Sequence, residues 1–227
     1  MTVETLAKEI MEGRLIGREE ALWLWEQPLE ALCEQADRIR KHFCAGRFDL
    51  CTIINGKSGR CSENCRFCAQ SAHNHTGAAE YPLLSAEEIV AQAKREDAQG
   101  VLRYSIVTSG KRLTDREVDE MCEAVRQIRR ECRLSVCISF GLLGEEQYRK
   151  LKAAGVTRVH NNLETSRNHF PEICTTHTFD DKVAAIRAAQ AAGLTVCSGG
   201  IMGMGETAED RIDMALTLRE LGIGVCR

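Results

Sequence analysis

The feature that most constrains the fold is a regular alternation of strand-like and helix-like segments after residue 48. Strands are predicted over residues 49–55, 101–108, 133–140, 156–164 and 194–200, and a sixth begins within 222–227. Helices between them have clear starts: Ser85 and Thr114 each stand three residues before a glutamate, which is the capping-box pattern. Alternation of this kind predicts a parallel sheet, either open or closed into a barrel.

The two faces of the predicted strands differ, and this difference favours a barrel. One face is apolar, whereas the other carries polar or thiol side chains. Because the covering helices need the apolar faces, the polar faces must converge inward. A barrel lumen is normally filled by Val, Ile and Leu, so a polar lumen predicts a barrel that holds a buried ligand or cluster. The predicted lumen residues include Arg103, Ser105, Cys137, Arg158, His160, Asn162, Glu164 and Cys197.

The predicted fold class is therefore α/β, a TIM-type (β/α)8 barrel. A complete barrel of this kind takes about 250 residues. This chain shows about five strand–helix units and the start of a sixth strand at Arg227, so we expect the barrel to be incomplete at its C-terminus. Residues 1–45 read as a helical extension, and residues 46–227 as the barrel domain.

Composition excludes several classes of partner. The net charge is −3 and no Lys/Arg stretch is interleaved with aromatic residues, which argues against nucleic-acid binding. No segment approaches the roughly 18 apolar residues of a membrane span, and the N-terminus lacks the pattern of an export signal. We expect a soluble, cytoplasmic protein.

Twelve cysteines are many for a chain of 227 residues. Without an export signal, metal or redox chemistry is a better explanation than a disulfide framework. Four of the cysteines lie in predicted helices and are expected to be small core residues, because free cysteine is often buried. These four are Cys33, Cys44, Cys122 and Cys132.

Three other cysteines form the motif C-x3-C-x2-C after the first predicted strand, at Cys61, Cys65 and Cys68. A fourth thiolate would saturate a metal cage, whereas three thiolates on a four-iron cluster leave one iron open to a small molecule. The alternative is a zinc site completed by His73 or His75. The motif's place is also informative, because barrels of this kind carry their chemistry at the carboxyl ends of the strands.

Several blocks of the sequence resemble a known family. The motif C-x3-C-x2-C with Phe67 before its last cysteine resembles that of radical S-adenosylmethionine (SAM) enzymes. The resemblance is closest to the biotin synthase family, and it rests on four blocks: NGKSGRCSENCRFCAQS, NNLETS (161–166), ICTTHT (173–178) and CSGGIMGMGET (197–207).

The resemblance implies a 4Fe-4S cluster on the three motif cysteines, with SAM on the open iron. Reductive cleavage of SAM would yield a 5′-deoxyadenosyl radical that removes hydrogen from dethiobiotin, and sulfur from an auxiliary cluster would complete biotin. SAM or substrate would contact Phe67, Asn162, Glu164, Gly199, Gly200 and Ile201. From the residues alone, Glu164 could instead be a lumen charge paired with Arg103 or Arg158.

The auxiliary cluster is where the sequence departs from the family pattern. Relatives are expected to hold a 2Fe-2S cluster with three cysteines and an arginine. Cys137 and Cys197 match two of these cysteines, but Ser105 replaces the third, and the arginine would lie beyond Arg227. Because iron prefers thiolate to a serine hydroxyl, we expect a variant auxiliary cluster. Cys51 and Cys174 are the possible substitute ligands.

The resemblance also implies a homodimer that receives electrons from a flavodoxin or a ferredoxin. Two alternatives stay open. The chain could be a radical SAM enzyme of the same barrel type with another substrate, or an inactive fragment.

Overall fold

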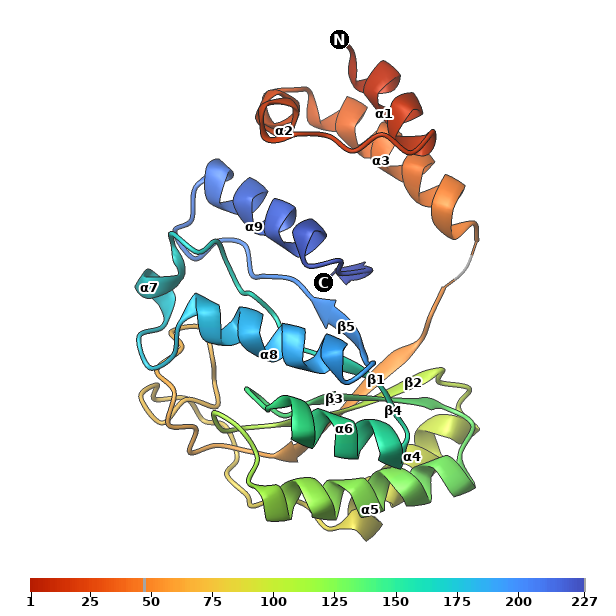
Figure 1. The fold of residues 1–227 in the computed structure, drawn as a ribbon, viewed down its shortest axis with the longest axis vertical. Coiled ribbons are helices and arrows are strands. Elements are labelled where there is room, and N and C mark those ends of the chain that lie inside the picture. Colours follow the sequence, from red (N-terminus) through yellow and green to blue (C-terminus); the bar gives the residue numbers. More distant parts are fainter. Residues whose placement is uncertain (47, 227) are drawn as a thin grey trace.

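A computed structural model describes residues 1–46 and 48–226, and it is drawn in Figure 1. The strands form one sheet in chain order, β1-β2-β3-β4-β5-β6, and every neighbouring pair is parallel. This confirms the predicted parallel α/β architecture. The strand bounds are β1 (Cys51–Lys57), β2 (Arg103–Thr108), β3 (Ser135–Ser139), β4 (Val156–His160), β5 (Thr195–Ser198) and β6 (Val225–Cys226).

Two strand predictions need correction. The fourth strand ends at His160 rather than at residue 164, because the chain leaves the sheet and Glu164 adopts a left-handed backbone with φ of 71°. The sixth strand covers only two of the predicted residues, and Arg227 lies outside the described part of the chain.

Helices connect the strands and begin where the capping residues predict. The side chains of Ser85, Thr114, Thr178 and Thr207 each accept a hydrogen bond from the backbone N–H three residues on. Each cap satisfies a donor that the first helical turn leaves unpaired. The helices are α4 (Ala86–Ala98), α5 (Asp115–Glu131), α6 (Glu145–Ala154), α7 (Phe170–Ile173), α8 (Phe179–Ala191) and α9 (Ala208–Glu220).

The core lies between the sheet and these helices. Tyr104 and Ile106 from β2 and Val136 and Ile138 from β3 are fully buried there. Each large apolar side chain removed from water contributes about 1.5–3 kcal/mol. The apolar strand faces therefore pack against the helices, as predicted, and the polar faces line the inside of the curved sheet.

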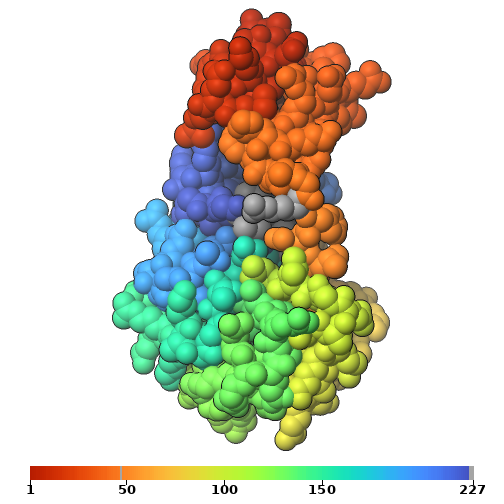
Figure 2. Space-filling view, turned by 90° about the vertical axis from the view of Figure 1, so that its right-hand side faces the viewer, coloured from red at the N-terminus to blue at the C-terminus, as the bar shows by residue number. Residues whose placement is uncertain are grey.

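The first three helices form a separate lobe at one end of the molecule (Figure 2). They are α1 (Val3–Met11), α2 (Arg18–Trp25) and α3 (Leu29–Cys44). The lobe contacts α9, where the Arg18 guanidinium lies 2.8 Å from the Glu209 carboxylate and 2.9 Å from that of Asp213.

The lobe also corrects one prediction about cysteines. Cys122 and Cys132 are buried, as expected, but Cys33 and Cys44 are exposed. Both exposed thiols lie on α3, which packs against α1 and leaves much of its surface to solvent. Within the described residues, no helix has both the length and the apolar character needed to cross a bilayer.

Candidate cluster and cofactor site

The cysteine motif lies on the long loop that follows β1, and backbone bonds fold this loop on itself. Residues Cys61 and Ser71 form a parallel bridge, in which the Ala72 N–H donates to the Cys61 carbonyl at 2.8 Å. The Asn74 side-chain amide donates to the carbonyls of Cys65 and Cys68 at 3.0 and 2.9 Å. These bonds fix the backbone around the three thiols.

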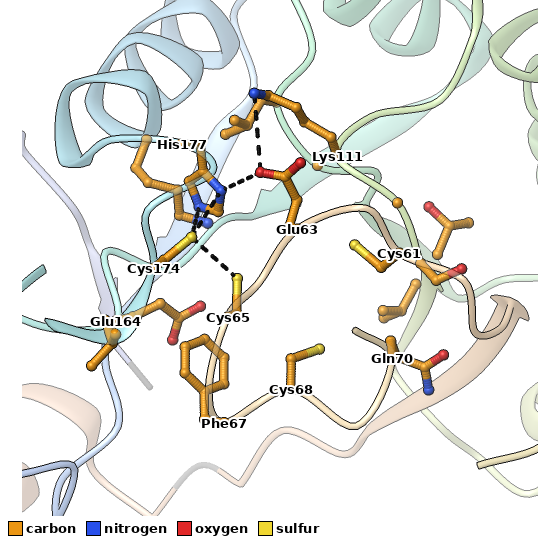
Figure 3. Close-up of a pocket in the computed structure, with 18 of the residues that line it drawn as sticks. Cys61, Glu63, Cys65, Phe67, Cys68, Gln70, Lys111, Glu164, Cys174 and His177 are labelled. Carbon is orange, nitrogen blue, oxygen red and sulfur yellow. Dashed lines mark hydrogen bonds and ion pairs between the residues drawn. The ribbon is translucent and has the colours of Figure 1, made fainter. Parts of the chain in front are cut away.

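The three motif thiols line one cavity of about 400 Å³ at the carboxyl ends of the strands. Figure 3 shows the thiols of Cys61, Cys65 and Cys68 around a common space. Phe67 lines the same cavity and is 37% exposed. Polar and charged residues complete the lining: Glu63 from the motif loop itself, Lys111, Glu164 and His177 from other loops, and Lys182 from α8.

A second segment, residues 173–178 with the sequence ICTTHT, docks against the motif loop. The Asn64 carboxamide binds it from one side: its oxygen accepts the Thr175 N–H at 2.9 Å, and its nitrogen donates to the Thr175 hydroxyl at 2.7 Å. The Arg66 N–H donates to the Ile173 carbonyl at 3.0 Å. Two residues between the motif cysteines therefore hold a segment more than a hundred positions away in the chain.

A buried polar relay continues this contact. The carboxylate of Glu63 accepts a hydrogen bond from His177 Nδ1 at 2.7 Å, and the same nitrogen lies 3.3 Å from the Cys174 sulfur. The Cys174 sulfur in turn lies 3.7 Å from the Cys65 sulfur. Burial lowers the pKa of His177, while Glu63 opposes that change. Burial and the adjacent Cys174 thiol both raise the pKa of Cys65, so a metal that binds there must displace a proton.

The two histidines of the sequence-based zinc alternative lie outside this arrangement. His73 and His75 are exposed, and the His73 ring bonds the Ser62 carbonyl at 3.2 Å. Among the residues that the structure describes, the group able to hold a metal at Cys65 contains Cys174 and His177 instead. The folded segment 173–178 brings them there, which no spacing near the motif could indicate.

The predicted SAM residues come together from two further loops. The Glu164 N–H donates to the Gly199 carbonyl at 3.1 Å, and the Ile201 N–H donates to the Glu164 carbonyl at 2.9 Å. A side chain at Gly200 would place its Cβ 2.5 Å from that same carbonyl oxygen. Only glycine permits this close approach. Asn162 donates to the Glu164 carboxylate at 3.3 Å, and its own buried side-chain oxygen has no hydrogen-bond partner.

The charge that faces Glu164 was not identified from the sequence. Burial raises the pKa of Glu164, and the nearby Lys182 ammonium opposes the change. Both side chains line the cavity. The alternative pairing with Arg103 or Arg158 is not what the structure shows, because Arg103 donates to the Thr157 hydroxyl and the Arg158 Nε is buried without a partner.

The predicted auxiliary residues lie deeper in the lumen, apart from this cavity. Ser105 and Cys137 are opposite each other in the β2–β3 register, and the Ser105 side chain lowers the pKa of the Cys137 thiol. Burial raises the pKa of Cys137, and the charges of Cys197 and Cys51 act in the same direction. Cys51 is exposed on β1, where its register partner on β2 is Arg103, whereas Cys174, the other candidate substitute, lies beside Cys65.

Comparison with known proteins decides the family. Residues 57–218 match the model of the radical SAM superfamily. The chain is 58% identical over 219 residues to the biotin synthase of Akkermansia muciniphila, covering 96% of this chain and 68% of that protein. It is 57% identical to the biotin synthase of Brachyspira hyodysenteriae, covering 98% of this chain and 67% of the other. The chain belongs to the biotin synthase family.

Solved structures agree on the fold of this family member. Methylornithine synthase (PylB) superposes with a TM-score of 0.85 at 22% identity, covering 98% of this chain and 66% of that one. The FeFe-hydrogenase maturase HydG from Carboxydothermus hydrogenoformans superposes with a TM-score of 0.78 at 19% identity, covering 98% and 54%. Compared with the biotin synthases that it matches, the chain spans about two thirds of their length.

Family membership implies a 4Fe-4S cluster, SAM and an auxiliary cluster, and the residues present fit the first two. Three thiols face one cavity, which suits a thiolate-bound cluster. The carboxylate of Glu164 and the ammonium of Lys182 line the same cavity. Asn162, which donates to Glu164, has an unpartnered side-chain oxygen. A zwitterionic ligand with a ribose offers groups complementary to each of these.

Proposed function

We propose that this protein acts as a biotin synthase, inserting sulfur into dethiobiotin in a reaction that begins with the cleavage of SAM. The observation that carries the proposal is the set of three motif thiols lining one cavity together with Glu164 and Lys182. The identity of 58% to a biotin synthase supports the choice of substrate.

Residues Cys61, Cys65 and Cys68 would hold the 4Fe-4S cluster through their thiolates. When bound, the cluster supplies the electron that cleaves SAM to a 5′-deoxyadenosyl radical. The backbone at Gly199–Ile201 pairs with Glu164 and forms the wall along which SAM would lie. Phe67 and Asn162 would complete the SAM and substrate contacts. The chain's own task is to place these groups and to exclude water.

The auxiliary cluster would bind in the lumen through Cys137 and Cys197. Ser105 occupies the position of the third family cysteine, and its hydroxyl is a poor ligand for iron. We propose that Cys51 supplies the missing thiolate, because its charge acts on Cys137 across β2, which lies between their two strands. The auxiliary cluster would then have Cys51 as a ligand in place of Ser105, and its type could differ from the 2Fe-2S cluster that the family resemblance implies.

The remaining expectations concern partners. A low-potential electron donor is implied by the family, and a flavodoxin or a ferredoxin is the proposed donor. The homodimer and the cytoplasmic location stay predictions.

The test is metal analysis and product analysis of the anaerobically reconstituted protein. We expect iron and sulfide in amounts that indicate two clusters, and both 5′-deoxyadenosine and biotin from SAM and dethiobiotin. Cys65→Ala should abolish SAM cleavage. Deoxyadenosine without biotin would instead support a radical SAM enzyme with another substrate. Zinc alone, or no bound metal, would overturn the proposal and favour an inactive fragment.

A further inference from the structure

Cys174 places a fourth thiol against the cluster loop without belonging to the C-x3-C-x2-C motif. It is buried, with its sulfur 3.7 Å from the Cys65 sulfur and 3.5 Å from the Thr176 hydroxyl. Its position is fixed from both sides. The Cys174 N–H closes the last turn of α7 on the Phe170 carbonyl at 3.1 Å, and Thr178 caps α8 four residues later.

The hydrogen bonds around Cys174 determine where its proton points. An ionised carboxylate only accepts hydrogen bonds, so His177 Nδ1 carries the proton that it shares with Glu63 at 2.7 Å. The Cys174 sulfur, 3.3 Å from that nitrogen, lies on the accepting side of the same N–H. The Cys174 S–H is thus not needed for His177 and has two oxygen or sulfur neighbours to choose from, the Thr176 hydroxyl at 3.5 Å and the Cys65 sulfur at 3.7 Å.

The pairing with Cys65 has one consistent direction once Cys65 binds iron. A metal-bound cysteine is a thiolate and has no proton to donate. In the metal-free structure the Cys65 S–H donates to the Cys174 sulfur. Once Cys65 binds iron, the bond between the two sulfurs can persist only in the reverse direction, from the Cys174 S–H to the Cys65 sulfur. Hydrogen bonds to the sulfurs of an iron–sulfur cluster are among the factors that set its reduction potential. Such a bond stabilises the more negative, reduced cluster.

We propose that Cys174 is a positioning residue that donates an S–H···S hydrogen bond to Cys65 and so raises the reduction potential of the SAM-binding cluster. The Glu63–His177 pair holds the Cys174 thiol in the donating orientation. This inference rests on the proposed function, since it requires a cluster on Cys65. It adds a contribution from the segment 173–178, which lies outside the cysteine motif.

The test is a redox titration of the anaerobically reconstituted protein, followed by electron paramagnetic resonance. The cluster of interest is identified by the change of its signal on addition of SAM. Four proteins are compared: the wild type, Cys174→Ala, Cys174→Ser and Cys122→Ala. The last removes a buried thiol of the core on α5, far from the cavity, and controls for loss of packing.

We expect equal iron content in all four proteins and a lower cluster potential in Cys174→Ala only. At a fixed potential in the transition, the ratio of reduced to oxidised cluster should fall about fivefold, the fold-change that corresponds to one net hydrogen bond. Cys174→Ser should recover most of this ratio, because a hydroxyl also donates.

Three outcomes would overturn the inference. An unchanged potential in Cys174→Ala would show that the thiol does not act on the cluster. Loss of iron in that variant would make Cys174 an iron ligand rather than a hydrogen-bond donor. Absence of any SAM-responsive cluster in the wild type would remove the proposed function as well, so the two failures are distinguishable.

Discussion

The acidic side chain of Glu206 stabilises the glycine-rich loop over residues 199–206, along which we propose that SAM lies. Its carboxylate accepts hydrogen bonds from the N–H groups of Gly203 and Met204 and from the Arg211 Nε, each at 2.7 Å. The side chain is only 2% exposed. The backbone donor of Gly203 is the main cause that lowers the pKa of Glu206 from 4.5 to about 2. Glu206→Gln replaces one accepting oxygen by an NH2 group that faces other donors.

The free energy at stake follows from the pKa. A fall from 4.5 to about 2 corresponds to about 3 kcal/mol at neutral pH. The loop backbone at Gly203 is exposed, so solvent screening reduces this, and we expect Glu206→Gln to lower the free energy of unfolding by about 1–2 kcal/mol. A carboxyl group with a lowered pKa stabilises the fold fully above its unfolded pKa and loses that contribution as the pH falls through its folded pKa. At pH 3, roughly 40% of the effect should remain.

The assay is urea unfolding of the metal-free wild type and of Glu206→Gln at several pH values from 7 to 3. The difference between the two proteins isolates Glu206, because other acidic groups titrate equally in both. Glu209→Gln is the matched control: it removes an exposed ion pair with Arg18 and should change the free energy of unfolding by less than about 0.5 kcal/mol. A difference for Glu206→Gln that stays constant from pH 7 to pH 3 would refute the assigned pKa.

Three further changes test the site. Gly200→Ala forces its Cβ against the Glu164 carbonyl and the Met214 sulfur. We therefore expect a loss of about 1–3 kcal/mol in the free energy of unfolding and weaker SAM binding by calorimetry. Unchanged SAM binding would contradict the proposal that SAM lies along Gly199–Ile201. Asn64→Ala removes the side-chain hydrogen bonds to two threonines of the segment 173–178. It should lower the free energy of unfolding by about 1–2 kcal/mol, and it should also reduce the amount of iron bound after reconstitution. Cys51→Ala should reduce the iron and sulfide content by one cluster per chain. Cys33→Ala, at another exposed thiol, on α3, is the control and should leave the iron and sulfide content unchanged. Equal loss in the two variants would exclude Cys51 as a ligand.

Much of the fold was predictable because its signals are local. The hydroxyls of Ser85 and Thr114 mark helix starts through bonds that span three residues. The alternation of apolar and polar residues along β2 and β3 is enough to separate the core face from the lumen face. Both features depend only on residues close together in the chain.

The parts of the site that escaped prediction depend on contacts between distant loops. Nothing near the motif indicates that His177 bonds Glu63, since the two are 114 positions apart. The sequence offered Arg103 and Arg158 as partners of Glu164, whereas the cation that acts on its carboxylate is Lys182, which α8 brings to the same cavity. The exposure of Cys33 depends on how the N-terminal lobe packs, which helical periodicity does not reveal.

The docking of the segment 173–178 on the motif loop has a consequence for folding. Contacts at separations of 109 to 114 residues require most of the strand–helix units between them to be in place first. A nascent chain that has emerged only as far as α4 contains every motif cysteine, yet it lacks the segment 173–178 that docks against them. Metal capture by three clustered thiols on an unfolded chain would therefore be unselective. Cluster insertion into this protein should therefore follow the folding of α8. A protein that carries its cluster would then be one in which the segment 173–178 has already docked.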